Sequence, residues 1–167
     1  MRKRHRILLA LLGVGIAGLI ASQGLREREP VYQGKPLSVW LERYDEGDYV
    51  AVTQQLWKKE TDEAVRQIGT NAIPVLLRRL RAKDSPFTIW LMALTRKQHF
   101  IKITYTPARI RHREGLDGIE ALGAEARRAA VPALLGCLND DDREVRRCAG
   151  MALKSIDPEA ALKAGVE

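Results

Sequence analysis

Histidine is the first residue type to weigh as a catalytic acid or base, and this chain of 167 residues has three. His5 lies in a basic stretch at the N-terminus. His99 follows Lys97-Gln98 at a predicted helix end, and His112 stands within a run of arginines. Neither His99 nor His112 has a serine, a cysteine and an acid nearby in a nucleophile arrangement. We therefore expect both to face solvent on helices, and we expect no catalytic residue and no enzymatic activity.

Metal and phosphate chemistry is the next possibility. Asn139-Asp140-Asp141-Asp142 is an acidic run, but it lacks the glycine and the distant glutamate of an EF-hand loop. We interpret it as the cap of the following helix, with Asp141 three residues before Glu144 as in a capping box. The glycines at 13, 15 and 18 belong to an apolar segment and make no phosphate-binding loop. We expect no metal and no cofactor.

The two cysteines allow one disulfide at most. Cys148 falls on the apolar face of a predicted helix, where a small buried residue is the default interpretation. Cys137 lies near the end of the preceding helix, and a short turn between the two helices would bring it close to the helix that carries Cys148. In an oxidising compartment a Cys137–Cys148 bridge can form, but the sequence leaves both the bridge and two separate thiols open.

Arginines give the clearest candidate binding surface. Arg78 and Arg81 lie off the apolar face of one predicted helix, and Arg127 and Arg128 lie at the start of another. If equivalent helices align their outer faces, these side chains form a basic strip that suits an acidic partner. The alternative is an ordinary solvated face balanced by Asp and Glu. We predict Arg78, Arg81, Arg127 and Arg128 as binding contacts.

Apolar residues recur at helical spacing from residue 36 onward, so helices must position these side chains. Leu37, Trp40, Leu41 and Tyr44 give the first such face, and Val131, Leu134, Leu135 and Leu138 give a later one. We predict helices over 36–45, 50–59, 62–69, 72–82, 86–97, 107–122, 127–138, 142–155 and 158–164. The alternating run 101–105 has no strand to pair with and is expected to be an extended connector. The predicted class is all-α.

The sequence also predicts where several helices start and end. Ser85-Pro86, Thr106-Pro107 and Asp157-Pro158 each place an N-cap oxygen before a proline that suits the first helical position. Gly69 and Gly123 suit the position after a helix, where a left-handed residue closes the turn. The residues expected to shape turns and caps are Gly69, Pro74, Gly123, Pro132, Asp141 and Pro158.

Two segments of the chain restate one another. Residues 68–77 read as a helix end, a glycine turn and a proline-started apolar helix, and residues 122–135 repeat that order with an insertion. A partial third copy begins at Ile156. The order Leu-Gly, Val-Pro-x-Leu-Leu, an acidic turn, Val-Arg-x-x-Ala and Ala-Leu resembles the HEAT-repeat, armadillo-like proteins. The match is good over 117–163, recognisable over 62–83 and weak over 31–58 and 84–116.

The resemblance implies helical hairpins that stack into a short right-handed α-solenoid over residues 36–167. Residues 32–41 (Tyr-Gln-Gly-Lys-Pro-Leu-Ser-Val-Trp-Leu) also resemble the opening segment of exported bacterial proteins of this kind. No hairpin buries its apolar face alone, so the outer helices must act as caps. Trp40, Leu41 and Tyr44 are expected to cover one end of the stack.

The N-terminus has the features of an export signal. A basic head precedes residues 7–22, which carry no charge, and small or polar residues follow. Residues 1–24 are therefore predicted to be a signal peptide or an uncleaved membrane anchor, with 25–35 as a linker. Either way the remaining domain is expected outside the cytoplasm, periplasmic or secreted.

Charge limits the class of partner. The chain has a net charge of +7, but residues 1–22 hold four of its 28 Lys and Arg and none of its 21 Asp and Glu, which leaves +3 for the rest. We therefore predict a non-enzymatic scaffold or adaptor that binds a protein in the cell envelope, and we do not expect nucleic acid as its partner. Two alternatives stay open: a nucleic-acid-binding module with an arginine-rich face, and a regulatory subunit that folds fully only against its partner.

Overall fold

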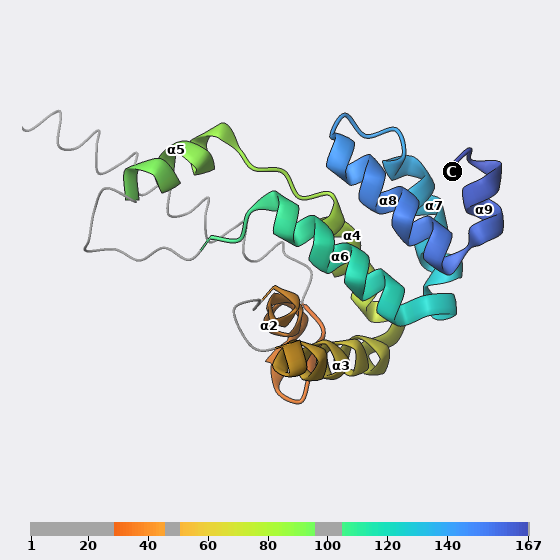
Figure 1. Cartoon of the computed structure of the whole chain (residues 1–167), viewed down its shortest axis with the longest axis horizontal. Helices are drawn as coiled ribbons and strands as arrows, with labels where there is room; N and C mark the ends of the chain where they lie inside the picture. Colours follow the sequence, from red (N-terminus) through yellow and green to blue (C-terminus); the bar gives the residue numbers. More distant parts are fainter. Residues whose placement is uncertain (1–28, 46–50, 96–104, 167) are drawn as a thin grey trace, which may run out of the picture.

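Helices make up nearly all of the regular structure, which confirms the all-α class. The computed structural model describes residues 29–45, 51–95 and 105–166 (Figure 1). The predicted signal or anchor at 1–24, with its apolar run 7–22, lies outside the described residues, as do His99 and residues 101–104. Among the described residues, no helix combines the length and the hydropathy needed to cross a bilayer.

A small hairpin opens the described chain. Strand β1 (Val31–Tyr32) pairs antiparallel with β2 (Lys35–Pro36). Gln33 and Gly34 make the turn between them at φ angles of 48° and 74°. Two positive φ angles in a two-residue turn match the twist of the flanking strands. The hairpin falls mostly in the predicted linker, and two-residue strands are too short to give an alternating pattern in the sequence.

The helical elements follow the hairpin in a simple order. In chain order they are α2 (Leu37–Leu41), the 3-10 turn η1 (Glu42–Tyr44), α3 (Ala51–Ile68), η2 (Gly69–Ala72), α4 (Ile73–Leu80), α5 (Pro86–Thr95), α6 (Ala108–Leu122), η3 (Gly123–Ala126), α7 (Arg127–Cys137), α8 (Arg143–Ile156) and α9 (Pro158–Lys163).

Most of these bounds fall within a few residues of the predicted ones, with one clear difference. The sequence predicts separate helices at 50–59 and 62–69, whereas α3 runs through both ranges without a break. No glycine or proline interrupts this stretch. Thr61 lies inside the helix, and its hydroxyl donates a hydrogen bond to the carbonyl oxygen of Trp40 at 3.1 Å. The two predicted helices are therefore one.

The glycine turns form as predicted. Gly69 and Gly123 have φ angles of 65° and 56°, and each opens a 3-10 turn that leads into the next helix. Pro74 lies in the first turn of α4, also as predicted. Pro132 does not start its helix, because α7 begins five residues earlier at Arg127 and contains the proline in its interior. The repeated sequence thus has a repeated order of helix, glycine, 3-10 turn and helix.

The predicted N-caps are partly right. Ser85 Oγ accepts a hydrogen bond from the Thr88 amide at 3.1 Å, and Asp157 Oδ1 accepts one from Ala160 at 3.1 Å, just before Pro158 begins α9. Asp141 is not the cap of α8. Asp142 takes that role, with Oδ1 accepting from the Glu144 amide at 2.8 Å. The sequence pattern could not distinguish these neighbours, because any of the aspartates 140–142 has a carboxylate that can cap the helix.

Helix α6 is the centre of the packing. It runs antiparallel to α4, since His112 meets Ala82 while Gly118 meets Leu76, and it also packs against α3 and α8. Helix α7 lies beside α4 and α8, and α9 closes against α8 (Figure 1). Helix α2 packs on α3 at the opposite end, where Trp40 and Leu41 are buried and Tyr44 is half-buried. The buried apolar residues of these helices pack together in one hydrophobic core.

Helices α4 and α6 approach closely because α6 carries two glycines on the shared face. A Cβ atom at Gly115 would lie 2.7 Å from the Leu76 carbonyl oxygen and 2.8 Å from the Leu80 nitrogen. One at Gly118 would lie 2.3 Å from a terminal methyl of Leu76. The backbone of α4 therefore occupies the space that a side chain at 115 would need, and the apolar core continues on both sides of this contact.

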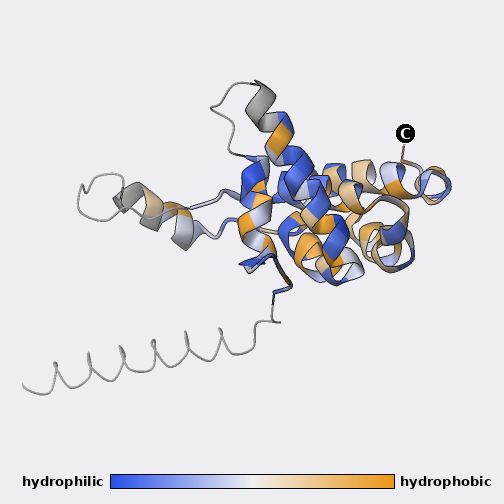
Figure 2. Ribbon diagram, turned by 90° about the horizontal axis from the view of Figure 1, so that it is seen from below, coloured by the Kyte–Doolittle hydropathy of each residue, from blue (hydrophilic) through white to orange (hydrophobic). Residues whose placement is uncertain are grey.

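Helix α5 departs from this arrangement. It connects α4 to α6 but projects away from the packed helices, as both views show (Figures 1 and 2). Its side chains Ile89 and Trp90 are 56% and 59% exposed. The segment that carries it corresponds to the stretch where the repeat pattern of the sequence is weak.

Candidate functional site

The arginines predicted from the sequence do not meet at one place. Arg81 joins α4 to α7: its Nε donates to Cys137 Sγ at 2.9 Å, and its Nη2 donates to the Ala133 carbonyl at 3.0 Å. Arg128 lies near the other end of α7, in a shallow hollow of about 530 Å³ with Thr70, Ala124, Glu125 and Ala129. Arg128 and Cys137 are nine positions apart in α7, which corresponds to about 14 Å along the helix axis.

The other two predicted arginines, Arg78 and Arg127, do not join these sites into one surface. Arg78 is exposed on α4, and Arg127 is the first residue of α7, with a side chain outside the description. The basic strip expected from the sequence is therefore divided between the two ends of the α4/α7 pair. Arg78, Arg127 and Arg128 stay predicted contacts, while Arg81 already bonds to two groups of α7.

A better-defined surface lies on α8. A hollow of about 470 Å³, called here the α8 hollow, is lined by Leu138, Arg143, Arg146, Arg147, Gly150, Met151, Lys154 and Val166. Helical periodicity places the α8 members on the face opposite Val145, Ala149 and Leu153, which are buried. The hollow is thus open to solvent on the side of α8 that is turned away from the core.

The rim of the α8 hollow is cationic. Arg147 pairs with Glu144 at 2.8 Å, and Arg146 Nη1 donates to the carbonyl oxygens of Asp140 and Asp141 at 2.6 and 2.9 Å. Within the described part of the chain, no carboxylate forms an ion pair with Arg143 or Lys154. Two cations of the rim therefore remain available to an acidic ligand.

The floor of the α8 hollow is apolar. Met151 is 43% exposed, and Leu138 and Val166 are half-buried beside it. Gly150 leaves room for Val166, because a Cβ atom at 150 would lie 3.0 Å from Val166 Cγ1. An exposed, adaptable methionine among basic side chains suits a ligand that presents apolar and acidic groups together.

Among the residues that the structure describes, the most deeply buried charged side chain belongs to α6 and was not singled out from the sequence. Glu114 is 1% exposed and forms an ion pair and hydrogen bond with Arg79 of α4. Arg79 also donates to the Ser38 carbonyl oxygen at 3.4 Å. Burial raises the pKa of Glu114, and Arg79 opposes that shift. Because Glu114 Oε1 has no hydrogen-bond partner among the described residues, Arg79 is the one cation that compensates the buried carboxylate.

Asp84 organises the start of α6 from outside that helix. Its Oδ1 accepts hydrogen bonds from the Tyr105 hydroxyl, from the Ala108 amide at 2.8 Å and from Arg111 Nη2 at 3.0 Å. Although burial alone would raise it, these bonds lower the pKa of Asp84. The predicted Thr106 cap is therefore wrong: Pro107 is the N-cap residue and makes no side-chain cap, and Asp84 supplies the oxygen.

His112 is not a solvent-facing residue. It is 3% exposed, and its Nε2 lies 2.6 Å from the Ala82 carbonyl oxygen, which ties α6 to the end of α4. The expectation of an exposed histidine is wrong because the charged run around it continues over the buried face of α6. Arg109 and Arg113 of that run are exposed, whereas His112 and Glu114 point inward.

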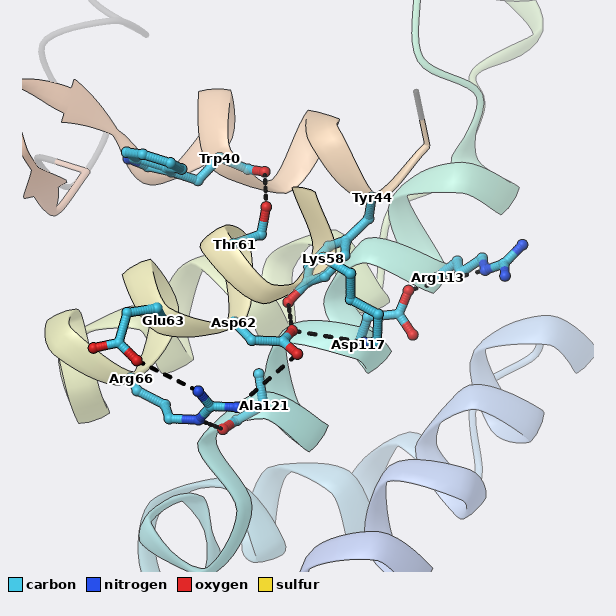
Figure 3. Close-up of polar contacts among 10 residues, drawn as sticks. All are labelled: Trp40, Tyr44, Lys58, Thr61, Asp62, Glu63, Arg66, Arg113, Asp117 and Ala121. Carbon is cyan, nitrogen blue, oxygen red and sulfur yellow. Dashed lines mark hydrogen bonds and ion pairs between the residues drawn. The ribbon is translucent and has the colours of Figure 1, made fainter. Parts of the chain in front are cut away.

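A third polar group joins α3 to its neighbours (Figure 3). The Tyr44 hydroxyl donates to Asp62 Oδ1 at 2.6 Å, and Lys58 lies 3.6 Å from the same oxygen. Burial, followed by the bond to Asp62, raises the pKa of Tyr44. Burial also raises the pKa of Asp117 on α6, against the opposing effects of Lys58 and Arg113. These residues connect η1, α3 and α6.

The two cysteines are separate thiols in the structure, and both are buried. Burial raises the pKa of Cys148 and so favours its protonated form. Across the described residues, no cluster of three or more His, Cys, Asp and Glu side chains is arranged to hold a metal ion.

Comparison of this chain with protein families, with curated proteins and with solved structures gave no match. Membership of the HEAT-repeat proteins therefore stays a prediction based on the sequence pattern.

Proposed function

We propose that this chain is a non-enzymatic scaffold or adaptor that binds an acidic, partly apolar segment of a partner protein. The observation that carries the proposal is the α8 hollow, in which Arg143 and Lys154 flank the exposed Met151. Charged residues at the rim of an interface orient the partner and increase the association rate. Apolar residues at its centre supply most of the binding free energy. Arg78, Arg127 and Arg128 are further contacts under this proposal.

The proposed frame is a short right-handed α-solenoid of HEAT-like hairpins. Three features support it. Helices α3, α6 and α8 pack in succession, α4 and α7 lie beside one another, and the glycine turns η2 and η3 are neighbours. In such a stack each hairpin is buried by the next, so the outer faces keep fixed positions relative to one another. A rigid frame would keep the α8 hollow in its binding conformation, so that little conformational entropy is lost when the partner binds.

The proposal also places the chain outside the cytoplasm, in the cell envelope. This part is supported by the basic head and the apolar run 7–22, read as a cleaved signal or an anchor in the inner membrane.

The α8 hollow can be tested with defined probes and the full-length chain. Fluorescence anisotropy is measured with an 18-residue peptide of Glu and Leu in helical spacing, with the same peptide carrying Ser for Leu, and with duplex DNA. We expect the Glu/Leu peptide to bind best. The double variant Arg143→Glu/Lys154→Glu should weaken it by about tenfold, or about 1.4 kcal/mol. Lys59→Glu, a charge reversal on α3, is the matched control and should change binding by less than twofold.

The same measurement separates the alternatives. Equal binding of all three probes, with a steep loss of affinity in salt, would support the nucleic-acid module instead. Preference for the Glu/Leu peptide without any effect of the double variant would place the binding surface elsewhere and refute the α8 hollow.

A further inference from the structure

Helix α5 has the composition of a buried helix in an exposed position. Its sequence, Pro-Phe-Thr-Ile-Trp-Leu-Met-Ala-Leu-Thr, has no charge, and only its two threonines are polar. A helix that is apolar on every side is normally covered by protein or by lipid. Yet α5 projects from the packed helices, and Ile89 and Trp90 are more than half exposed (Figure 2).

The helix itself is properly formed. Ser85 caps its first turn through the Thr88 amide, and Pro86 occupies the first helical position. Its base is fixed, because Asp84 bonds to Tyr105 and to the Ala108 amide on the far side of the segment. The projection is therefore attached to α4 and α6 at a defined place.

The charge around α5 differs in sign from that of the rest of the domain. From Ser85 to Arg113 the sequence has no Asp or Glu and six Lys and Arg. Outside this stretch and residues 1–22, the chain has 18 Lys and Arg against 21 Asp and Glu. The sequence segment that contains the apolar helix is thus strongly positive, whereas the remainder of the chain after residue 22 is slightly negative, and a positive segment complements an anionic surface.

We infer that α5 binds the surface of an anionic lipid bilayer. Ten helical residues span about 15 Å, half of the roughly 30 Å hydrocarbon core, so α5 enters one leaflet and does not cross. Trp90 suits the boundary between headgroups and acyl chains, and exposed cations that follow in the described chain, Arg109 and Arg113, can pair with anionic headgroups. This contact is separate from residues 7–22 and independent of the α8 hollow.

Tryptophan fluorescence tests the inference in the full-length chain. The three tryptophans are Trp40, Trp57 and Trp90, and none lies in residues 1–24, so the signal does not report insertion of the N-terminal segment. The protein is mixed with vesicles of phosphatidylglycerol and phosphatidylcholine whose acyl chains carry bromine, a contact quencher. We expect strong quenching that is largely lost in Trp90→Phe.

Two further variants identify the cause. Ile89→Asp should lower the bromine quenching of Trp90 at least about tenfold without changing the melting temperature, because the side chain is exposed. Quenching is the readout, since residues 7–22 would bind vesicles by themselves under the proposed anchor. Leu162→Asp on α9, where the leucine is 79% exposed, is the control and should bind as the unmodified chain does. Pure phosphatidylcholine vesicles should bind more weakly than anionic ones.

The inference fails if Trp90→Phe leaves the quenching unchanged, since Trp90 would then lie outside the bilayer. It fails equally if Trp90 is quenched as strongly in Ile89→Asp as in Leu162→Asp. A helix that docks into a protein groove would give both results. Neither result bears on peptide binding at the α8 hollow.

Discussion

At the scale of single residues, Arg78 and Arg79 are neighbours in α4 with opposite surroundings. Arg78 is exposed, whereas Arg79 reaches inward to the buried carboxylate of Glu114 and to the Ser38 carbonyl oxygen. The same residue type thus carries out two different tasks at adjacent positions. Removing the inward arginine leaves a buried charge without compensation, which costs far more than the loss of a surface ion pair.

We expect Arg79→Ala to lower the free energy of unfolding by about 3–5 kcal/mol. Arg78→Ala is the matched control and should change it by less than about 0.5 kcal/mol. The double variant Arg79→Met/Glu114→Leu should recover most of the loss, because no charge then remains buried. Denaturant unfolding measures all three, and equal effects of Arg79→Ala and Arg78→Ala would contradict the role assigned to the ion pair.

Sequence patterns could not distinguish these two arginines. Helical spacing places both arginines off the apolar face, and the acid that selects Arg79 comes from α6, 35 residues away. His112 and Glu114 were missed for the same reason, since they stand in a charged run that looks solvated throughout. Cys148, by contrast, was correctly placed inside, because its own helix supplies the full apolar pattern.

At the scale of elements, the contact between α4 and α6 depends on the absence of a side chain. The backbone of α4 lies where a Cβ atom of residue 115 would be, so the two helices must separate if one is added. At Gly118 the obstacle is a terminal methyl of Leu76, which can rotate away. A larger residue is therefore expected to be tolerated less well at position 115 than at position 118.

Gly115→Ala should destabilise the protein by about 1–3 kcal/mol despite the better helix propensity of alanine. Gly136→Ala in α7 is the control: the site is open, with Arg81 Nη2 4.0 Å away, and we expect stabilisation by about 0.5 kcal/mol. Thermal melting of both variants checks this. A Gly115→Ala protein as stable as Gly136→Ala would mean that α4 and α6 are not closely packed.

Element bounds were predictable where a local signal marks them. Gly69 and Gly123 do close turns, and Asp157 with Pro158 does begin α9. The prediction was wrong where the decisive partner is distant, as with Asp84, which caps α6 from 24 residues away. It was also wrong where several residues could fill one role, as in the acidic run before α8. The start of α7 at residue 127 was predicted correctly, but Pro132, expected to shape a turn or cap, lies inside that helix.

At the scale of the whole molecule, the helices divide into a connected body and one projection. Helix α6 touches α3, α4 and α8, so none of these can open without disrupting it. Helix α5 has no comparable packing partner in the described chain. The class and the order of the helices follow from apolar periodicity, but nothing in that periodicity indicates that α5 lies outside the body, because its composition is that of a core helix.

Hydrogen exchange in lipid-free buffer should reveal this division. We expect amides of 108–122 to exchange only through global unfolding, while those of 86–95 exchange through local opening with protection at least about a hundredfold lower. Mass spectrometry of the corresponding peptides measures both, with 143–156 as a second core reference. Equal protection of the α5 and α6 peptides would show that α5 is packed within the body.

The attachment of the projection at Asp84 has a consequence for tolerance to change. One carboxylate holds the departing chain and the returning chain together, through Tyr105 at one point and Ala108 at another. The geometry of the junction therefore does not depend on the segment 85–104 between these residues. Doubling the length of this segment costs only about 0.6 kcal/mol in loop-closure entropy. This junction is the natural place in the molecule to graft a foreign peptide or a reporter domain.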